Sequence, residues 1–379
     1  MILSGDWLQD SAAQAVCAAL VAGGHQALFV GGCVRNALLA MPIGDIDIAT
    51  DATPDRVIDL ARAAGLKPVP TGIDHGTVTI VAEARPHEVT TFRRDVETFG
   101  RHATVAFSTR IEEDAARRDF TMNALYARPD GTVVDPLGGL PDLRARHVRF
   151  VGDPESRIRE DYLRILRFFR FTAWYGDPAL GMDAEGLAAC AAGIDGLSGL
   201  SKERIGAEVR KLLAAADPAP AVASMAATGI LTAILPGADP RALAPLIHLE
   251  LDAAPDWLRR LAALGGAEPT DHLRLSRAES RDLAALRMAV ESTDTPRVLG
   301  WRLGARRGSD AVLLRACLLE QPIPPQAMAD VAHGATARFP VTAADLPGLI
   351  GPALGQELKR LEKAWLASDL RLTRSQLLG

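Results

Sequence analysis

The feature that most constrains this chain is a short segment in which a glycine turn precedes two closely spaced acids. Residues 31–36 read Gly-Gly-Cys-Val-Arg-Asn, and residues 44–47 read Gly-Asp-Ile-Asp. Asp45 and Asp47 are two positions apart, so on a β-strand their side chains point to the same face. Two convergent carboxylates beside a turn that approaches phosphates are typical of a Mg²⁺ site. The segment therefore predicts a phosphate-binding turn joined to a metal site.

Such a site suits nucleotidyl transfer. In this reaction two metal ions, roughly 4 Å apart, activate an attacking hydroxyl and stabilise a leaving pyrophosphate. We expect a third carboxylate nearby, and Glu88 is the best placed because it begins a neighbouring predicted strand. The alternative is that Asp45 and Asp47 are solvated acids on a strand and that Glu88 is an exposed strand residue. The glycines at this spacing before the acid pair favour the catalytic interpretation.

The composition permits two or three domains and argues against several classes of protein. The chain has 379 residues, of which 48% are hydrophobic, which is enough for more than one core. No apolar run is long enough to span a bilayer, and residues 1–12 lack the basic segment of a secretory signal. The four cysteines form no CxxC pair, which predicts reduced thiols in the cytoplasm. The net charge of −5 disfavours nucleic-acid binding mildly, but eight arginines within residues 144–170 offer a local phosphate-binding surface.

The first part of the chain reads as a small α/β sheet domain. Apolar periodicity predicts helices at 1–24, 34–39, 54–65 and 117–127. Short apolar or alternating runs predict strands at 25–30, 45–49, 77–82, 88–92, 133–134 and 147–152. Thr53-Pro54 is a strong helix start, since proline suits the first helical position. Residues 93–116 are charged and aperiodic, and we interpret them as a mobile loop.

The rest of the chain reads as helical. Asp153 begins a long predicted helix that runs through Tyr175. From residue 188 to the end the chain is rich in alanine and leucine, and prolines separate the helical stretches. No repeat of fixed period is present in the sequence.

A second candidate motif spans residues 117–125, Arg-Arg-Asp-Phe-Thr-Met-Asn-Ala-Leu. Arg118 is suited to phosphate, and Asp119 to ribose, because a carboxylate only accepts hydrogen bonds and both ribose hydroxyls donate them. Asn123 is a further candidate for nucleotide binding. The alternative is an ordinary helix start, with Asp119 near the positive end of the helix dipole.

A third candidate motif, at residues 160–167, reads Glu-Asp-Tyr-Leu-Arg-Ile-Leu-Arg and ends in Arg167. Asp161 and Arg164 are three apart on the predicted helix and face the same way. Such a pair can accept from the exocyclic amine and donate to the ring nitrogen of cytosine or adenine. Guanine and uracil present the opposite polarity, and each mispaired buried group costs about 1–3 kcal/mol. The pair would thus accept CTP and ATP and refuse GTP and UTP. The alternative is a surface ion pair.

Together these motifs resemble the class II tRNA nucleotidyltransferase and bacterial poly(A) polymerase family, within the polymerase-beta-like nucleotidyltransferases. The segments that carry the resemblance are 30–35, 44–47, 75–79, 88–93, 117–125, 135–139 with 142–143, 160–164 and 201–205 with Glu208 and Lys211. The resemblance implies an α+β fold, in which a small polymerase-beta-like head precedes an all-helical neck, body and tail. It divides the chain into a catalytic head at 1–150, a neck that recognises the base at 151–215 and an RNA-binding body and tail at 216–379.

The resemblance also implies roles for single residues. Asp45 and Asp47 would bind Mg²⁺ and, with Glu88, form the catalytic set. The nucleotide-binding set comprises Gly31, Gly32, Arg35, Arg118, Asp119, Asn123, Asp161, Arg164 and Arg167. One departure is Asn36, because the family usually has an aspartate after the arginine. Asparagine keeps the shape and one acceptor but loses the charge, so we expect a structural hydrogen bond to survive there.

The implied function is the addition or repair of the 3′-terminal CCA of tRNA from CTP and ATP, with release of pyrophosphate, in the cytoplasm and without a membrane. A poly(A) polymerase with the same core is an alternative, although strand 75–81 lacks the Arg-rich, apolar character that we associate with that branch. Enzymes that add only C or only A remain open. An alternative from another class is a non-catalytic RNA-binding helical protein with a degenerate head, against which the intact acid pair argues. Protein partners are not indicated.

Overall fold

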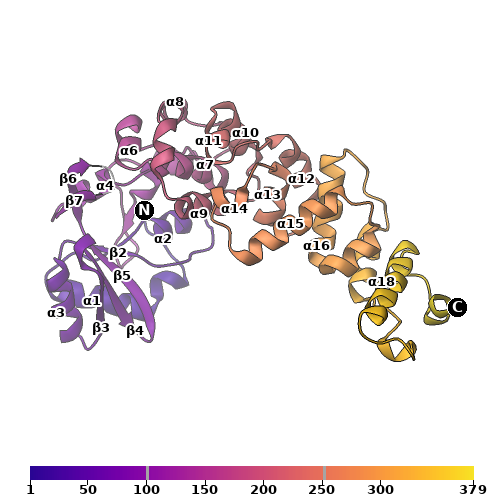
Figure 1. The fold of residues 1–379 in the computed structure, drawn as a ribbon. Helices are drawn as coiled ribbons and strands as arrows, with labels where there is room; N and C mark the ends of the chain where they lie inside the picture. The colour runs from indigo at the N-terminus through magenta and orange to yellow at the C-terminus, as the bar shows by residue number, and fades with distance from the viewer. Residues whose placement is uncertain (100–101, 251–252) are drawn as a thin grey trace. The chain divides into compact units, whose positions relative to one another are not determined.

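The computed structural model describes residues 1–99, 102–250 and 253–379. The chain divides into two compact units, Met1–Leu200 and Ser201–Gly379. The first unit contains the strands as well as helices, and the second contains helices (Figure 1). This arrangement confirms the predicted α+β head followed by a helical remainder.

The first unit is built around a mixed sheet of seven strands in the order β3-β4-β5-β2-β1-β8-β9. The strands are β1 Leu28–Val30, β2 Ile48–Thr50, β3 Lys67–Gly72, β4 Thr77–Ala82, β5 Arg85–Thr91, β8 Tyr126–Ala127 and β9 Val133–Val134. β2 and β5 run parallel, and the other neighbouring pairs are antiparallel. The chain between β2 and β5 passes through helix α3 and the strands β3 and β4, which supplies the crossover that a parallel pair requires.

Helices α1 (Ser11–Ala22) and α3 (Pro54–Ala63) pack on one face of the β3–β4–β5 part of this sheet (Figure 1). In β4 every second residue is buried, including Val78 and Ile80, as the predicted alternation requires. α3 begins at Pro54 after Thr53, which confirms the predicted start. The predicted helix over residues 1–24 is shorter in the structure. A 3₁₀ turn η1 (Asp6–Gln9) comes first, and the Asp10 side chain then caps the start of α1.

Residues 93–116 are not a loop, and this prediction was wrong. β6 (Arg93–Phe99) and β7 (His102–Phe107) form an antiparallel hairpin, and helix α4 (Ile111–Ala116) follows. Residues 100 and 101 lie outside the described part of the chain. The error arose because the charged residues of β6 were taken as a loop, although Ala103, Val105 and Phe107 occupy every second position of β7.

Residues 117–127 do not form the predicted helix either. Phe120 bridges to Phe150, residues Thr121–Asn123 form the 3₁₀ turn η3, and β8 then joins the sheet beside β1. The bridge at Phe150 is all that the described residues form of the strand predicted at 147–152. A short, nearly continuous apolar run is compatible with a buried helix or a buried strand. Here the end of the run, Tyr126–Ala127, becomes a strand because it pairs with the edge of β1.

The long helix predicted from Asp153 to Tyr175 is two helices, α6 (Pro154–Glu160) and α7 (Leu163–Tyr175). Asp161 lies at the break, in an extended conformation with φ −154° and ψ 105°. The buried face of α7 packs its aromatic side chains Phe168 and Phe171 against Phe150 and Phe120. The ring centroids of Phe120 and Phe171 are 4.9 Å apart, and those of Phe150 and Phe168 are 5.3 Å apart. Helices α2 (Gly32–Leu38), α5 (Leu140–Arg144) and α8 (Ala184–Ala192) complete the regular helices of this unit.

The second unit is helical throughout its described regular elements, which confirms the prediction for this region. Its helices are α9 Lys202–Leu213, α10 Ala219–Ala227, α11 Ile230–Ile234, α12 Leu243–Glu250, α13 Trp257–Leu264, α14 Pro269–His272, α15 Arg277–Glu291, α16 Pro296–Leu318, α17 Ala327–Thr336, α18 Gly351–Ala367 and α19 Arg374–Leu378. Among the residues that the structure describes, no helix combines the length and apolar character needed to cross a membrane.

A buried ionic cluster lies in the core of the second unit. Glu250 accepts hydrogen bonds from Arg259 Nε at 2.9 Å and from Arg260 Nη2 at 2.6 Å. Arg259 also pairs with Asp310 at 2.7 Å, and Arg260 donates to the carbonyl of Leu213 at 2.7 Å. All four charged side chains are buried, and each has several partners, as buried charges require. The cluster joins α12, α13 and α16 to the end of α9.

Candidate nucleotide-binding site

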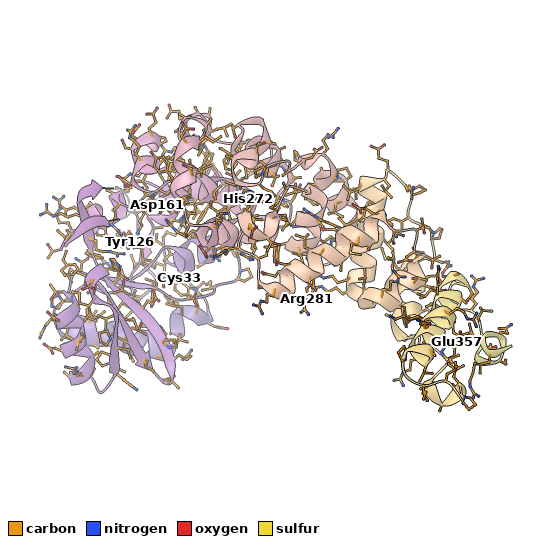
Figure 2. All side chains as sticks on the ribbon, viewed as in Figure 1. Cys33, Tyr126, Asp161, His272, Arg281 and Glu357 are labelled. Carbon is orange, nitrogen blue, oxygen red and sulfur yellow. The ribbon has the colours of Figure 1, made fainter. Side chains whose placement is uncertain are left out.

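The glycine turn lies where β1 ends and α2 begins. Gly31 has φ 71° and ψ −117°, a conformation that favours glycine, and its N–H donates to the carbonyl of Leu125 at 3.2 Å. Helix α2 starts at Gly32, two residues earlier than predicted. The N–H groups of its first turn have no partner within the helix, so they are available to an anion. Figure 2 labels Cys33 of this helix together with Tyr126 and Asp161.

The two acids approach the turn from the other side. Asp45 is exposed and Asp47 is half-buried, and both precede β2 in a segment without helix or strand. The chain at Asp47 already pairs with β1, because the N–H of Val30 donates to the Asp47 carbonyl at 3.0 Å. This bond fixes the acid segment directly beside the residue that precedes the glycine turn.

Glu88 is brought to Asp47 by the parallel pairing of two strands. Ile48 of β2 is opposite Val89 of β5, so the residue before each, Asp47 and Glu88, lies at the same level. Val89 is buried and Glu88 is exposed, which puts the Glu88 carboxylate on the outer face. The prediction that Glu88 begins a strand was off by three residues, since β5 starts at Arg85.

The electrostatics of this corner are dominated by negative charge. Burial raises the pKa of Asp47, the nearby carboxylates of Glu88 and Asp45 raise it further, and Arg118 partly opposes them. Among the described residues, no group of three or more His, Cys, Asp or Glu side chains is close enough together to hold a metal ion. Mg²⁺ is commonly held by one or two carboxylates, with waters and substrate phosphates as its other ligands. The donor set of Asp45 and Asp47 therefore fits a hard divalent cation that arrives with a nucleotide.

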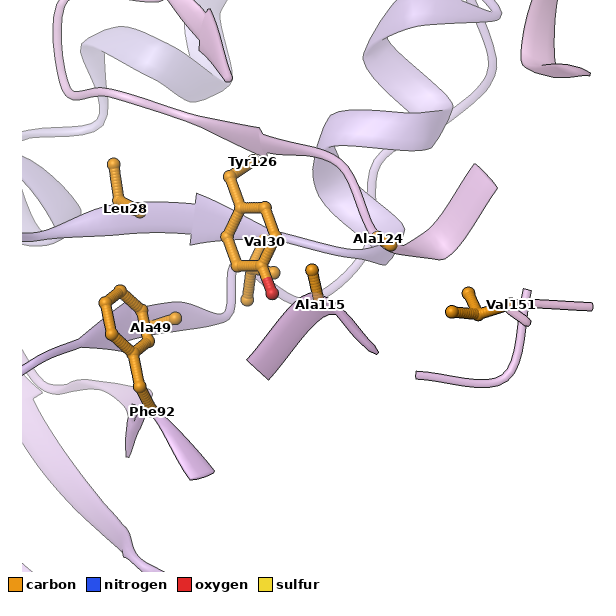
Figure 3. Packing of buried hydrophobic residues seen from close by; sticks show 8 residues of the cluster. All are labelled: Leu28, Val30, Ala49, Phe92, Ala115, Ala124, Tyr126 and Val151. Atoms are coloured by element: carbon orange, nitrogen blue, oxygen red, sulfur yellow. The ribbon is translucent and has the colours of Figure 1, made fainter. Parts of the chain in front are cut away.

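Arg118 is fixed over the glycine turn by a buried acid and a tyrosine. Its Nε donates to the Tyr126 hydroxyl at 3.0 Å and its Nη2 to Asp114 Oδ2 at 2.9 Å, while the Tyr126 hydroxyl donates to the same Asp114 oxygen at 2.7 Å. A Cβ on Gly31 would lie 3.4 Å from Arg118 Nη1. Figure 3 shows the Tyr126 ring within the core cluster that includes Val30 and Ala115. Sequence reasoning missed Asp114 and Tyr126, because it assigned them to a loop and to a helix.

Asp119 is buried, and all of its acceptor positions are occupied. Its Oδ1 accepts from the Phe120 N–H and from Asn123 Nδ2, both at 2.8 Å, and its Oδ2 accepts two bonds from Arg167, the one from Nε at 2.7 Å. These four donors fill the capacity of a carboxylate. Burial acts to raise the pKa of Asp119, but the charge of Arg167 and the hydrogen bonds outweigh it and lower the pKa. A further donor could reach Asp119 only by replacing one of these four, and the Arg167 side chain is 31% exposed. The contact of Asp119 with a ribose stays a prediction.

Arg35 is buried and points toward helix α7. Its Nη1 donates to Asn123 Oδ1, and its Nη2 donates to the Tyr175 hydroxyl at 2.8 Å. The guanidinium carbon is 4.1 Å from the centroid of the Tyr175 ring. Arg35 thus joins the glycine turn to α7, and its contact with a triphosphate stays a prediction.

Asp161 and Arg164 are not on one continuous helix, so the predicted common face was wrong. The Asp161 carboxylate accepts the N–H of Leu163 at 3.1 Å and so begins α7. Arg164 Nη1 donates to Glu160 and to the carbonyl of Arg157, the latter at 2.7 Å. The extended backbone at Asp161 turns its side chain away from the regular helical spacing. Whether the pair reads a base stays a prediction, and Glu160 is a partner of Arg164 that sequence reasoning did not include.

Two known domain families match the chain. A family described as the poly A polymerase head domain matches residues 27–149. A second, described as a probable RNA and SrmB-binding site of polymerase A, matches residues 181–241.

Curated relatives are similar over half of this chain or more. A CCA-adding enzyme of Geobacillus thermodenitrificans is 42% identical over 242 residues, which are 63% of this chain and 55% of that enzyme. The mitochondrial CCA tRNA nucleotidyltransferase 1 of Homo sapiens is 44% identical over 190 residues, which are 50% of this chain and 44% of that protein. The chain thus spans about half the length of the curated relatives it matches.

Solved structures extend the likeness to the whole fold. The CCA-adding enzyme of Bacillus stearothermophilus in complex with CTP has a TM-score of 0.72 and 29% identity, over 94% of this chain and 93% of that chain. The Thermotoga maritima CCA-adding enzyme complexed with tRNA has a TM-score of 0.69 at 16% identity, over 100% and 98% of the two chains, and shows the fold alone. In its glycine turn and acid pair, its two matched domains and its fold, the chain is similar to CCA-adding enzymes, and its residues 27–149 match the poly A polymerase head family.

Proposed function

We propose that this protein is a nucleotidyltransferase that adds or repairs the 3′-terminal CCA of tRNA from CTP and ATP and releases pyrophosphate. The observation that carries the proposal is the glycine turn at Gly31, which lies beside Arg118 and is joined through Val30 to the segment of Asp45 and Asp47. The names of the relatives at 42% and 44% identity, which refer to CCA addition, support the choice of substrate.

The side chains of the head divide the work of the reaction in this proposal. Asp45 and Asp47 hold Mg²⁺, which when bound neutralises charge on the reacting phosphate and lowers the pKa of the attacking 3′ hydroxyl. The first-turn N–H groups of α2, at Gly32 and beyond, bind triphosphate oxygens, and Arg118 donates to them from its fixed position. Glu88 adds negative charge beside Asp47 and strengthens the attraction for a cation.

Recognition of the nucleoside belongs to the region around α7. A ribose hydroxyl takes the place of one Arg167 donor on Asp119, which releases the Arg167 guanidinium toward the nucleotide. Asn123 keeps Asp119 in place through this exchange, because its bond reaches the other carboxylate oxygen. Asp161 then accepts from the exocyclic amine of cytosine or adenine, and Arg164 donates to the ring nitrogen.

The helical second unit binds the tRNA in this proposal. The family match at residues 181–241 is described as a probable RNA-binding site, which supports RNA contact by α9 and α10. One enzyme must serve many tRNAs, so these contacts go to the backbone and to shape rather than to bases. The cytoplasm is the proposed location, on the sequence argument from reduced thiols.

The decisive experiment uses a tRNA that lacks its last three nucleotides. The purified protein is incubated with this tRNA, Mg²⁺ and CTP, ATP, GTP or UTP, singly and combined, and the 3′ ends are sequenced. CTP alone should add two residues, and CTP with ATP should complete CCA. Ends that never change under any condition would contradict the proposal.

A poly(A) polymerase is the second candidate, since the matched head family carries that description. The same assay separates the two functions. A long adenylate tail on the tRNA with ATP alone would favour the second candidate, whereas arrest after a single A that requires a preceding CC favours CCA addition.

A further inference from the structure

The guanidinium of Arg35 is buried, and neutral groups hold it in place. The residue is 7% exposed and belongs to α2. Its Nε and Nη2 donate to Asn36 Oδ1 at 3.1 Å and 2.8 Å, and its Nη1 donates to Asn123 Oδ1. Its Nη2 also donates to the Tyr175 hydroxyl at 2.8 Å. All three acceptors are uncharged groups, so they fix the guanidinium without neutralising its charge.

Tyr175, the last residue of α7, contacts this guanidinium in two ways. Its hydroxyl accepts the hydrogen bond, and the guanidinium carbon of Arg35 is 4.1 Å from the centroid of its ring. Tyr175 is 8% exposed, and its ring lies beside that of Phe171, at a centroid separation of 5.3 Å. A guanidinium is attracted to the face of an aromatic ring within about 6 Å, and more strongly where water is excluded. Tyr175 therefore limits the positions that the Arg35 side chain can take.

The surroundings of Arg35 favour an anionic ligand. The guanidinium carbons of Arg35, Arg167 and Arg170 lie 5.2, 5.2 and 4.5 Å from the centroid of the Phe171 ring. Burial lowers the pKa of Arg35, and the two other arginines lower it further. Because the contacts that hold Arg35 are neutral, its charge stays available to attract the phosphates of a nucleotide.

The restraint on Arg35 extends to Asp119, the candidate ribose-binding residue. Arg35 donates to the oxygen of the Asn123 amide, so the NH₂ group of that amide faces Asp119 and donates to its Oδ1 at 2.8 Å. Both Asn123 and Asp119 are buried. Without the bond from Arg35, the amide can rotate and face the carboxylate with its own oxygen, which the carboxylate repels. The position of Arg35 thus decides whether Asp119 keeps one of its four donors.

We propose that Tyr175 is a positioning residue of the nucleotide site, which acts on Asp119 through Arg35 and Asn123. The inference rests on the proposed function, in which Asp119 contacts the ribose. Loss of the phenol lets the Arg35 side chain take several positions, and the Asn123 amide then loses its fixed orientation. Asp119 becomes less ordered as a result. A nucleotide that depends on its ribose hydroxyls binds less well, because the site is no longer organised before binding.

The test compares Tyr175→Phe, which removes the hydroxyl and keeps the ring, with Tyr175→Leu, which removes both. Thr172→Val is the matched control. It removes one side-chain hydrogen bond, to the Phe168 carbonyl at 2.9 Å, from the same helix. Thermal unfolding verifies that each variant is folded.

Two measurements follow the effect from Arg35 to the ribose. The chain contains two asparagines, Asn36 and Asn123, and both accept a hydrogen bond from Arg35. Nuclear magnetic resonance of protein labelled with ¹⁵N-asparagine therefore gives side-chain amide signals that all report on this guanidinium. Isothermal titration calorimetry measures the affinity for CTP and for 2′,3′-dideoxy-CTP, which lacks the ribose hydroxyls.

The signals of both side-chain amides should shift in the two Tyr175 variants. The affinity for CTP should fall by about fivefold in Tyr175→Phe, as the loss of one hydrogen bond predicts, and by about twentyfold in Tyr175→Leu. The affinity for 2′,3′-dideoxy-CTP should change by less than about twofold in Tyr175→Phe, because this nucleotide has no hydroxyl for Asp119. The control should match the wild type in all measurements.

Three results in a folded Tyr175→Phe protein would each overturn the inference: wild-type amide signals, an unchanged affinity for CTP, or equal losses for the two nucleotides. None of these measurements requires tRNA. A wild type that binds CTP but fails to extend tRNA would therefore count against the proposed function and not against the role of Tyr175.

Discussion

Replacing Asp114 by asparagine tests the arrangement that holds Arg118 over the glycine turn. The side chain of Asp114 is 2% exposed, and the same oxygen accepts from Arg118 and from the Tyr126 hydroxyl. The amide keeps the shape and an acceptor for Tyr126 but loses the charge that pairs with Arg118. A hydrogen bond to a charged group contributes about 1.5–3 kcal/mol. We therefore expect Asp114→Asn to lose about 2 kcal/mol of unfolding free energy at pH 7.

The difference in unfolding free energy between the wild type and Asp114→Asn should depend on pH. Burial acts to raise the pKa of Asp114, but Arg118 and Tyr126 lower it below the ordinary value of 3.8. A carboxyl group whose pKa is lower in the folded state stabilises the fold above its unfolded pKa and loses that contribution as the pH falls through the folded pKa. The advantage of the wild type over Asp114→Asn should thus be constant at neutral pH and shrink below pH 3.8.

Urea denaturation of both proteins at neutral and acid pH measures this difference, with Glu112→Gln on the same helix as the control. Glu112 is exposed, so its variant should stay within about 0.5 kcal/mol of the wild type. The KM for CTP should rise in Asp114→Asn, because Arg118 loses its fixed position. An Asp114→Asn protein that is as stable as Glu112→Gln at pH 7 would refute the reasoning.

Three further outcomes are expected. Asp45→Ala and Asp47→Ala should each reduce CTP incorporation below about a tenth of wild type with unchanged thermal unfolding, and higher residual activity would contradict the metal assignment. Asp161→Ala should weaken discrimination between CTP and UTP, measured as the ratio of kcat/KM values on a primed tRNA, by about 1–3 kcal/mol; an unchanged ratio would make the residue structural. Glu250→Ala leaves Arg259 and Arg260 without their shared carboxylate, so urea denaturation should show a loss of about 3–5 kcal/mol, and a loss below about 1 kcal/mol would show that this cluster is dispensable.

Local chemistry is what made parts of the head predictable from the sequence. Proline after threonine marks the first turn of α3, because proline has no N–H to lose there. Alternation of apolar residues marks β4, because successive side chains on a strand point to opposite faces. The glycine turn and the acid pair were recognisable for the same reason, since positive φ at Gly31 and the spacing of Asp45 and Asp47 are properties of neighbouring residues.

Pairing between distant segments was beyond the sequence, and it decided the rest of the site. β8 forms at Tyr126 because the edge of β1 is open to it, and this pairing brings the Tyr126 hydroxyl to Asp114 and Arg118. The parallel register of β2 and β5 brings Glu88 to the level of Asp47. Residue types and spacings along the chain determined which groups are candidates for the chemistry. Only tertiary structure decided their hydrogen-bond partners, because each partner lies on another element whose position depends on packing far along the chain.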